Sequence, residues 1–209
     1  MREFEKIETV FNRDTTGSKK LIEGDYRNET VEYLKDNKWV WTEKIDGTNT
    51  RIIWDGHSVS FAGHTDNANV PQFLIDKLTE MFGGSVNEEL FEQKFGATPV
   101  ILYGEGYGPK IQKGGLYRSD LSFILFDVFI GDLYLKREDV EDIAKTFNID
   151  AVPIIFTGAI DEAVAFVKTH PKSTIGNAPM EGVVGRPMVE MKDRRGNRII
   201  VKVKVKDFC

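Results

Sequence analysis

The sequence predicts an α+β fold in which largely antiparallel sheets are flanked by helices. Short apolar runs rich in β-branched and aromatic residues recur along the chain, and several are joined by tight-turn dipeptides. Between them lie three segments in which apolar residues recur with helical spacing. Hairpins interspersed with helices are typical of the α+β class. Because the 209 residues contain no internal repeat and no linker rich in Pro, Gly or Ser, we expect one domain over residues 1–209.

The expected elements follow in chain order. Strands are predicted over residues 38–45, 50–63, 99–108, 122–135, 180–191 and 195–205, with turns at Asp55-Gly56, Gly131-Asp132 and Gly196-Asn197. Helices are predicted over residues 71–82, 137–148 and 161–170, which open with Pro71, with Arg137-Glu138-Asp139 and with Asp161-Glu162.

Composition excludes several classes of protein. The 41% apolar and 29% charged residues are typical of a soluble globular chain, and no apolar run approaches the roughly 18–20 residues of a membrane span. The amino terminus is charged and lacks the apolar core of a secretion signal. The only cysteine, Cys209, allows neither an internal disulfide nor a cysteine-cluster zinc site. We therefore expect a cytoplasmic protein, and a phage or bacterial origin would suit so compact a chain.

The charge of the chain is unevenly distributed. The net charge is −5, which by itself does not indicate a nucleic-acid binder. The segment from 192 to 206 nevertheless contains seven basic residues and only one acidic residue, Asp193. The basic residues are Lys192, Arg194, Arg195, Arg198, Lys202, Lys204 and Lys206. Such a region is either a solvated face that balances acidic helices or a local surface for phosphates.

The first chemical candidate is Lys44, which stands directly before a tight turn in the run K-I-D-G-T-N. A lysine can act as a nucleophile where its surroundings favour the free amine. On this stretch alone, an ordinary surface lysine beside a hairpin turn is the favoured interpretation.

Two further candidates lie in predicted strands. In Y-G-E-G-Y-G-P, closely spaced glycines would let the backbone approach a ligand, and Glu105 could accept hydrogen bonds from ribose hydroxyls. In S-F-I-L-F-D-V, Phe123 and Phe126 are three apart, so a strand places them on opposite faces. One ring could stack on a purine while the other enters the core. A flexible loop and core packing of both rings are the alternatives.

The last two candidates are close to the carboxyl terminus. Glu181 is a lone acid in the apolar run M-E-G-V-V-G-R-P, where it needs a lysine, a metal or a hydroxyl as a partner, and Arg186 ends that run. In I-I-V-K-V-K-V-K, alternation places Lys202, Lys204 and Lys206 on one face. That face either is exposed to solvent or binds a polyphosphate.

In their order along the chain, K-x-D-G-x-N, Y-G-E, an aromatic strand ending in F-D, E-G-V-V-x-R and K-x-K resemble the motifs of the covalent nucleotidyltransferase superfamily. This superfamily comprises polynucleotide ligases and messenger-RNA capping enzymes. Asn49 favours the RNA ligase branch, because DNA ligases and capping enzymes usually have arginine at the matching place. The likeness is to the phage-type RNA ligase 2 family and runs from about Lys38 to Phe208. It implies an ATP-grasp-like ligase adenylylation domain.

The resemblance also implies a reaction, an ATP-dependent joining of RNA 3′-hydroxyl and 5′-phosphate ends with Mg²⁺ or Mn²⁺. In this family a lysine attacks the α-phosphate of ATP, expels pyrophosphate and keeps AMP. The AMP then passes to a 5′-phosphate, and a 3′-hydroxyl finally attacks that phosphate and releases AMP.

The roles that the resemblance implies fall on the quoted motifs. Lys44 would be the nucleophile, with Lys202 and Lys204 contacting the α-phosphate. Residues expected to bind the nucleotide are Glu43, Ile45, Asn49, Glu105, Phe123, Glu181 and Arg186. Within that set Glu105 would take the ribose, Phe123 would cover the adenine, and Glu181 would also help to hold the metal ion.

Two departures from the family pattern bear on the nucleic-acid steps. His64 stands where the family carries an arginine, so we expect either His64 or another cation, such as Arg51, to contact the nucleic acid. The chain also ends just after the last motif, so we expect no carboxyl-terminal OB domain. A pre-aligned RNA substrate (a nicked duplex or hybrid) or an accessory partner would then supply the grip. We expect a monomer that does not bind membranes.

Two other functions remain open on the sequence. A minimal ATP-dependent DNA ligase would use the same chemistry, and a nucleotide-binding protein without turnover would keep recognition but form no covalent AMP. A capping guanylyltransferase is disfavoured by Asn49.

Overall fold

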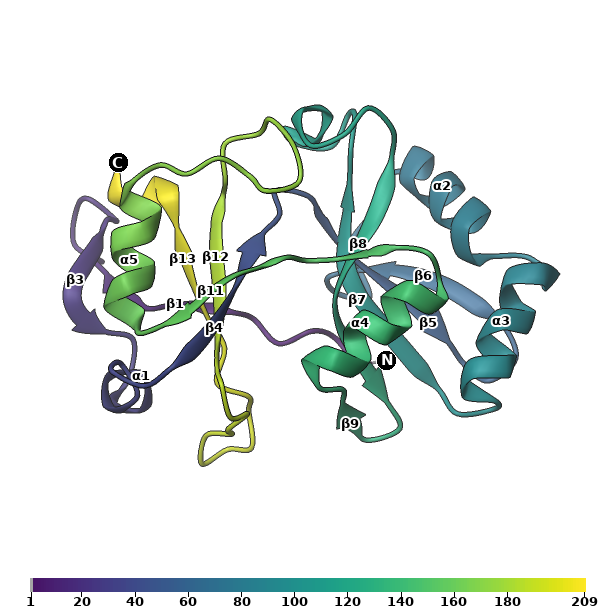
Figure 1. Ribbon diagram of the computed structural model, residues 1–209, viewed down its shortest axis with the longest axis horizontal. Helices are drawn as coiled ribbons and strands as arrows, with labels where there is room; N and C mark the ends of the chain where they lie inside the picture. The colour runs from purple at the N-terminus through teal and green to yellow at the C-terminus, as the bar shows by residue number, and fades with distance from the viewer. Residues whose placement is uncertain (1) are drawn as a thin grey trace. The chain divides into compact units, whose positions relative to one another are not determined.

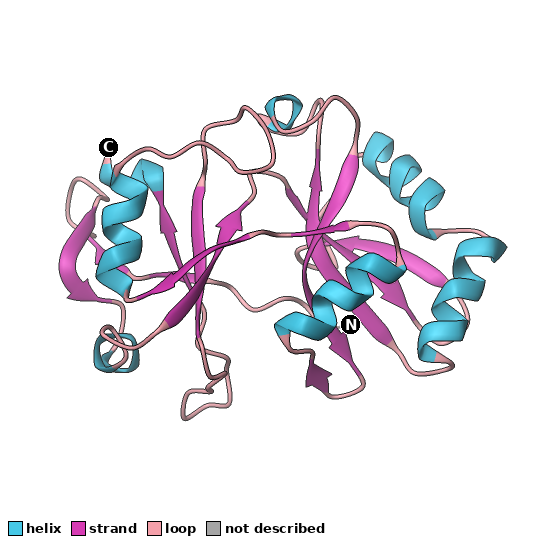
Figure 2. Ribbon diagram, viewed as in Figure 1, coloured by secondary structure: helices cyan, strands magenta, loops and turns pink. Residues whose placement is uncertain are grey.

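The computed structural model describes residues 2–209, which form two compact units. Unit 1 comprises residues 2–4 and Asp46–Val152, and unit 2 comprises Glu5–Ile45 and Pro153–Cys209. Each unit has its own main sheet (Figure 2). Each also has its own apolar core. That the whole chain forms one nucleotidyltransferase domain stays a prediction.

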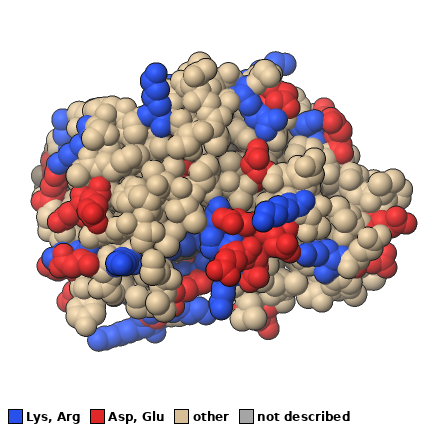
Figure 3. All heavy atoms as spheres, viewed as in Figure 1, with Lys and Arg blue, Asp and Glu red and all other residues tan. Residues whose placement is uncertain are grey.

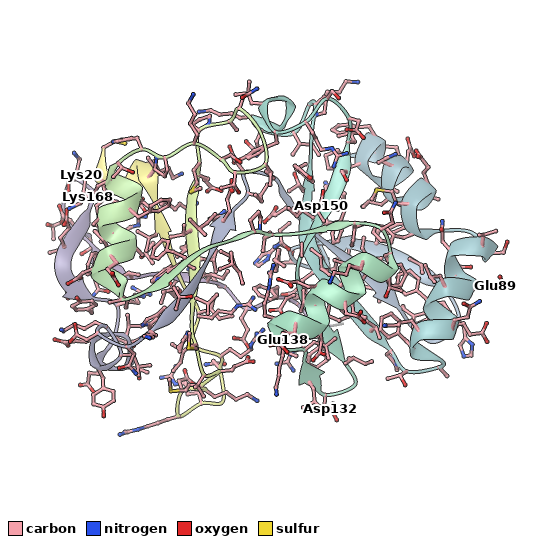
Figure 4. The ribbon with its side chains drawn as sticks, in the orientation of Figure 1. Lys20, Glu89, Asp132, Glu138, Asp150 and Lys168 are labelled. Atoms are coloured by element: carbon pink, nitrogen blue, oxygen red, sulfur yellow. The ribbon has the colours of Figure 1, made fainter. Side chains whose placement is uncertain are left out.

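Unit 2 is built on a five-stranded sheet. Its spatial order is β1 (Glu8–Thr9), β13 (Val201–Lys204), β12 (Gly182–Pro187), β4 (Trp39–Lys44) and β11 (Ile154–Gly158). Only the β1–β13 pair is parallel among these neighbours. The unit also contains α1 (Glu29–Tyr33), α5 (Ile160–Lys168), the short helix η2 (Val205–Phe208) and the hairpin of β2 (Phe11–Arg13) and β3 (Leu21–Tyr26). Lys168 of α5, which is labelled in Figure 4, pairs with Glu23 of β3, with 2.6 Å between Nζ and Oε2.

One face of this sheet forms the core of unit 2. Trp39 and Trp41 alternate on β4 and are fully buried, and they join Val183 of β12 and Val203 of β13 beneath the apolar side of α5. Gly185 lets β12 lie against Trp41, because a Cβ at this glycine would come within 2.3 Å of the indole ring. The intervening residues of the same strands, Lys44 among them, therefore project from the other face.

Unit 1 is built on a six-stranded sheet. The order is β10 (Asp150–Ala151), β8 (Ser122–Ile130), β7 (Val100–Tyr107), β5 (Thr48–Trp54) and β6 (Val59–Gly63), with β9 (Leu133–Tyr134) also paired to β8. Figure 1 shows α2 (Gln72–Phe82), α3 (Ser85–Phe95) and α4 (Arg137–Thr146), which together cover one face of this sheet; η1 (Gly114–Leu116) lies in the loop between β7 and β8.

The helices of unit 1 are held by an aromatic and aliphatic core. Phe82 of α2 packs edge-on to Phe91 of α3 and to Phe123 of β8, with ring centroids 6.4 and 5.6 Å apart. Leu78 is also fully buried, and truncating a leucine in such a place costs about 2–5 kcal/mol of stability. This packing makes the other face of the sheet, which carries Asn49 and Glu105, the one available to ligands.

The predicted α+β class, with largely antiparallel sheets flanked by helices, is confirmed. Each predicted strand and helix has a counterpart, although the strand predicted over residues 195–205 begins only at Val201. The helices α1 and α3 and the strands β1, β2, β3, β10 and β11 were not predicted. The helix α3 was not predicted because apolar residues recur only weakly at helical spacing in its sequence. Only Phe91 and Phe95 are buried in this helix. Within residues 2–209, the longest helices have 11 residues, and none is long and apolar enough to cross a membrane.

Candidate active site

A single carboxylate is shared by two lysines on the open face of unit 2. The sheet register places Gly182 of β12 directly between Lys44 of β4 and Lys204 of β13. The preceding residue, Glu181, accepts from both: its Oε2 lies 2.6 Å from Lys44 Nζ and its Oε1 lies 2.8 Å from Lys204 Nζ. A Cβ at Gly182 would lie 2.1 Å from the Val203 carbonyl oxygen, so only glycine allows β12 and β13 to approach this closely.

The shared carboxylate is mostly withdrawn from solvent. The side chain of Glu181 is 16% exposed, and those of Lys44 and Lys204 are 21% and 17% exposed. Burial alone would raise the pKa of Glu181, but the charges and hydrogen bonds of Lys44 and Lys204 outweigh it and hold this pKa below its ordinary value. Glu181 is therefore ionised at neutral pH, and it orients two ammonium groups.

Two further cations lie on the same face. Lys202 is two residues before Lys204 on β13, and Arg186 follows Gly182 by four positions on β12. The Lys202 ammonium group forms no hydrogen bond or ion pair with any residue in 2–209, whereas its backbone carbonyl accepts from the Val10 nitrogen. Its pKa is lowered by burial first and then by the like charges of Lys204 and Lys44. The predicted grouping of Lys44, Glu181, Lys202 and Lys204 is thus present in this unit.

Glu43 and Ile45, the neighbours of Lys44, are both buried. Glu43 lies on the opposite face of β4 and accepts from Thr174, with 3.0 Å to the backbone nitrogen and 2.6 Å to Oγ1. It thereby fastens the segment that leads into Glu181. This placement favours a positioning role for Glu43, where a nucleotide contact was expected.

In unit 1, Asn49 and Glu105 are paired across β5 and β7. The Asn49 side-chain oxygen is buried and accepts no hydrogen bond from the described part of the chain, so it could accept one from a ligand. Gly47 lets the turn after Lys44 approach Glu105, because a Cβ there would lie 2.7 Å from the Gly106 carbonyl oxygen and 3.0 Å from the Glu105 Cβ. The glycine of K-I-D-G-T-N is thus explained by close packing.

Phe123, the residue predicted to cover the adenine, lies in the core of unit 1. This ring is fully buried among the helices, on the face opposite Ile124, which is the residue paired with Glu105. Phe126 lies outside that core at a register shift in β8, is half-buried and contacts Phe4, with ring centroids 5.0 Å apart. Of the two aromatic residues, Phe126 is therefore the one available to a base.

Arg51 and His64 are placed differently from one another. The side chain of Arg51 is fully buried, where Nε donates to the Gly63 carbonyl oxygen at 2.7 Å and Nη2 pairs with Asp66 at 2.7 Å. This favours a structural role, and we do not propose Arg51 as a nucleic-acid contact. His64 is exposed in the segment that the Arg51–Asp66 pair holds.

No group of three or more His, Cys, Asp or Glu side chains that could hold a metal ion occurs within residues 2–209. Glu181 remains the predicted carboxylate. A Mg²⁺ ion commonly needs only one or two protein carboxylates when substrate phosphates and water complete its shell. The residues present fit a metal that arrives with a polyphosphate.

The chain is similar to solved RNA ligases of Naegleria gruberi. A lysine-to-alanine variant with ATP and Mn matches at a TM-score of 0.64 and 18% identity, over 97% of this chain and 60% of that chain. The ligase with PPi matches at 0.61 and 18%, over 98% and 62%. An apo variant of RNA ligase R4a matches at 0.61 and 19%, over 86% and 52%. At such identity the likeness shows the fold, and this chain spans only about half to three fifths of those chains.

A family model described as RNA ligase matches residues 37–204. This range includes the strands that carry Lys44, Glu105, Glu181, Lys202 and Lys204. The chain belongs to the RNA ligase family.

Proposed function

We propose that this chain is an ATP-dependent RNA ligase that joins 3′-hydroxyl and 5′-phosphate ends through AMP bound to Lys44. The observation that carries the proposal is the carboxylate of Glu181 held between the ammonium groups of Lys44 and Lys204, in a member of the RNA ligase family. A protein that only bound nucleotide would need no such positioned lysine.

The first step would be attack of the Lys44 nitrogen, as the free amine, on the α-phosphorus of ATP. The Lys44 ammonium group first releases one proton to solvent to give this amine. A nitrogen–phosphorus bond then forms, the bond to the bridging oxygen breaks, pyrophosphate leaves, and the nitrogen releases a second proton to solvent or to the pyrophosphate. Lys202 and Lys204 would stabilise the negative charge that develops on the phosphate oxygens. Glu181 would keep Lys44 and Lys204 in position by the hydrogen bonds described above.

The nucleotide would be recognised by residues of unit 1. Glu105 would accept from the ribose hydroxyls, the open acceptor of Asn49 would take a ligand donor, and Phe126 would stack on the adenine in place of Phe123. A divalent cation held by Glu181 and the phosphates would neutralise phosphate charge. The similar Naegleria ligase solved with ATP and Mn supports this pair of ligands.

The first test is covalent labelling. We expect the wild-type chain to retain label from α-labelled ATP after denaturation when Mn²⁺ or Mg²⁺ is present, and we expect Lys44→Ala to retain none. Lys38→Ala is the matched control, because it removes an exposed lysine of the same unit and should label like the wild type. Label that persists in Lys44→Ala would contradict the assignment of the nucleophile.

Phe126→Ala should raise the KM for ATP in the labelling reaction. Base–aromatic stacking is worth about 1–3 kcal/mol, so the KM should rise between roughly 5-fold and 150-fold. Phe126→Tyr keeps a ring and should retain the wild-type KM, which controls for the contact with Phe4. An unchanged KM in Phe126→Ala would exclude stacking at this position.

The lowered pKa of Lys202 predicts a pH effect. Since burial and its neighbours Lys204 and Lys44 lower this pKa, Lys202 loses its positive charge at a lower pH than an ordinary lysine near 10.5. The rate of labelling should therefore begin to fall at correspondingly lower alkaline pH. Lys202→Arg stays charged, and its rate, relative to its own rate at neutral pH, should persist further into the alkaline range. If the labelling rates of the wild type and Lys202→Arg fell over the same alkaline pH range, the positive charge of Lys202 would not contribute to labelling.

A further inference from the structure

A basic groove lies in unit 2 next to the proposed phosphate-binding lysines. It has a volume of about 610 Å³. Six cations and one carboxylate are among its lining residues: Lys6, Arg13, Arg27, Lys202, Lys204 and Lys206, with Glu8. Only Lys202 and Lys204 fall within the RNA ligase family match, so the other four cations are supplied by segments outside it.

The amino-terminal segment builds this groove by extending the sheet. The strand β1 pairs with β13 in parallel register, with Thr9 opposite Lys202. Lys6 precedes β1, Arg13 ends β2, and Arg27 follows β3. The ends of these three strands thus bring their cations to the edge of the sheet beside β13. Lys206 approaches from η2, directly after Lys204 and Val205.

The charges of the groove are only partly balanced. Glu8 lies 3.4 Å from Lys6 and 3.4 Å from Arg27, so one carboxylate serves two cations. Arg13 pairs with Asp207 at 2.6 Å. Lys206, like Lys6, is exposed. On the face drawn in Figure 3, basic side chains lie in small groups among acidic ones. A chain with a net charge of −5 needs such a local excess of cations to bind a polyanion.

We propose that this groove binds the phosphodiester backbone of the RNA strand, and that Lys6 and Lys206 contact its phosphates. The inference rests on the proposed function and extends it to residues outside the catalytic motifs. It requires a ligand with several phosphates in a row, because the cations are spread from β13 to the outer edge of the sheet.

The distance from Lys44 to the outer edge of the groove favours a strand over the triphosphate of ATP. Three strand spacings of about 4.8 Å separate β4, which carries Lys44, from β1, or about 14 Å in total. Successive nucleotides of a strand can cover that distance, whereas the phosphates of ATP are joined through single oxygens. A second hollow of about 1110 Å³ shares Lys6, Glu8 and Arg27 with the groove and continues to Arg194 and Arg195. A strand could follow this path beyond the groove.

The test separates RNA binding from the use of ATP. Wild type and Lys6→Ala/Lys206→Ala would be titrated into a fluorescent single-stranded RNA with a 5′-phosphate and a blocked 3′ end, at several salt concentrations. Each phosphate contact on a single strand contributes about 0.7 to the slope of log K against log salt, so the slope should fall by about 1.4 and affinity by about tenfold. Labelling of Lys44 by ATP should stay at the wild-type level.

Lys38→Ala/Lys172→Ala is the matched control, because it removes two exposed lysines of the same unit that do not line the groove. This control should bind RNA with the wild-type affinity and slope. Since all four lysines are exposed, neither double variant should lose stability, which thermal unfolding would check.

Several results would overturn the proposal. RNA binding by the groove variant that equals wild type or control would show that the strand takes another path. A loss of ATP labelling in the groove variant alone would assign the groove to the phosphates of ATP. Absent labelling in the wild type would contradict the proposed function instead, and the RNA titrations would still decide whether the groove binds a strand.

Discussion

The arrangement of the site in unit 2 depends on one mostly buried carboxylate between two ammonium groups. Glu181 is costly to bury alone, and Lys44 and Lys204 make its charge tolerable by occupying both of its oxygens. That geometry in turn requires β12 to lie between β4 and β13 in one register, with glycine at position 182. A shift of one residue on any of the three strands would turn its functional side chain into the core.

The two faces of the sheet in unit 2 have different roles: one packs in the core, and the other carries the proposed catalytic lysines. The tryptophans of β4 and the valines of β12 and β13 pack beneath α5, and the lysines between them are left on the open face. Glu43 lies on the packed side yet still serves the site, because its hydrogen bonds to Thr174 hold the segment that ends at Glu181. The amino-terminal strand β1 adds to the same sheet, so its addition brings further cations beside Lys202.

Much of the fold follows from local patterns, because alternation, turn dipeptides and helix starts identified the main strands and three of the helices. Motif order also pointed to Lys44, Glu181 and Lys204, which the register brings together. What local patterns do not show depends on tertiary packing. The spacing of Phe123 and Phe126 shows that they face opposite ways, but only the helices of unit 1 decide which ring is buried. Likewise, the sequence does not show that Arg51 is buried. Its burial and its ion pair with Asp66 are visible only in the folded structure. The pairing of β1 with β13 joins residues nearly the whole chain apart, and no local signal predicts it.

In the proposed reaction, the lysine held by Glu181 becomes the covalent carrier of AMP. The wild-type chain would first be freed of any bound nucleotide. Peptide mapping by mass spectrometry would then compare this chain before and after incubation with ATP and Mn²⁺. We expect one AMP adduct, on the peptide that contains Lys44 and bonded to the nitrogen of that lysine. An adduct on a different residue, or none in active-site-intact protein, would contradict the proposed reaction.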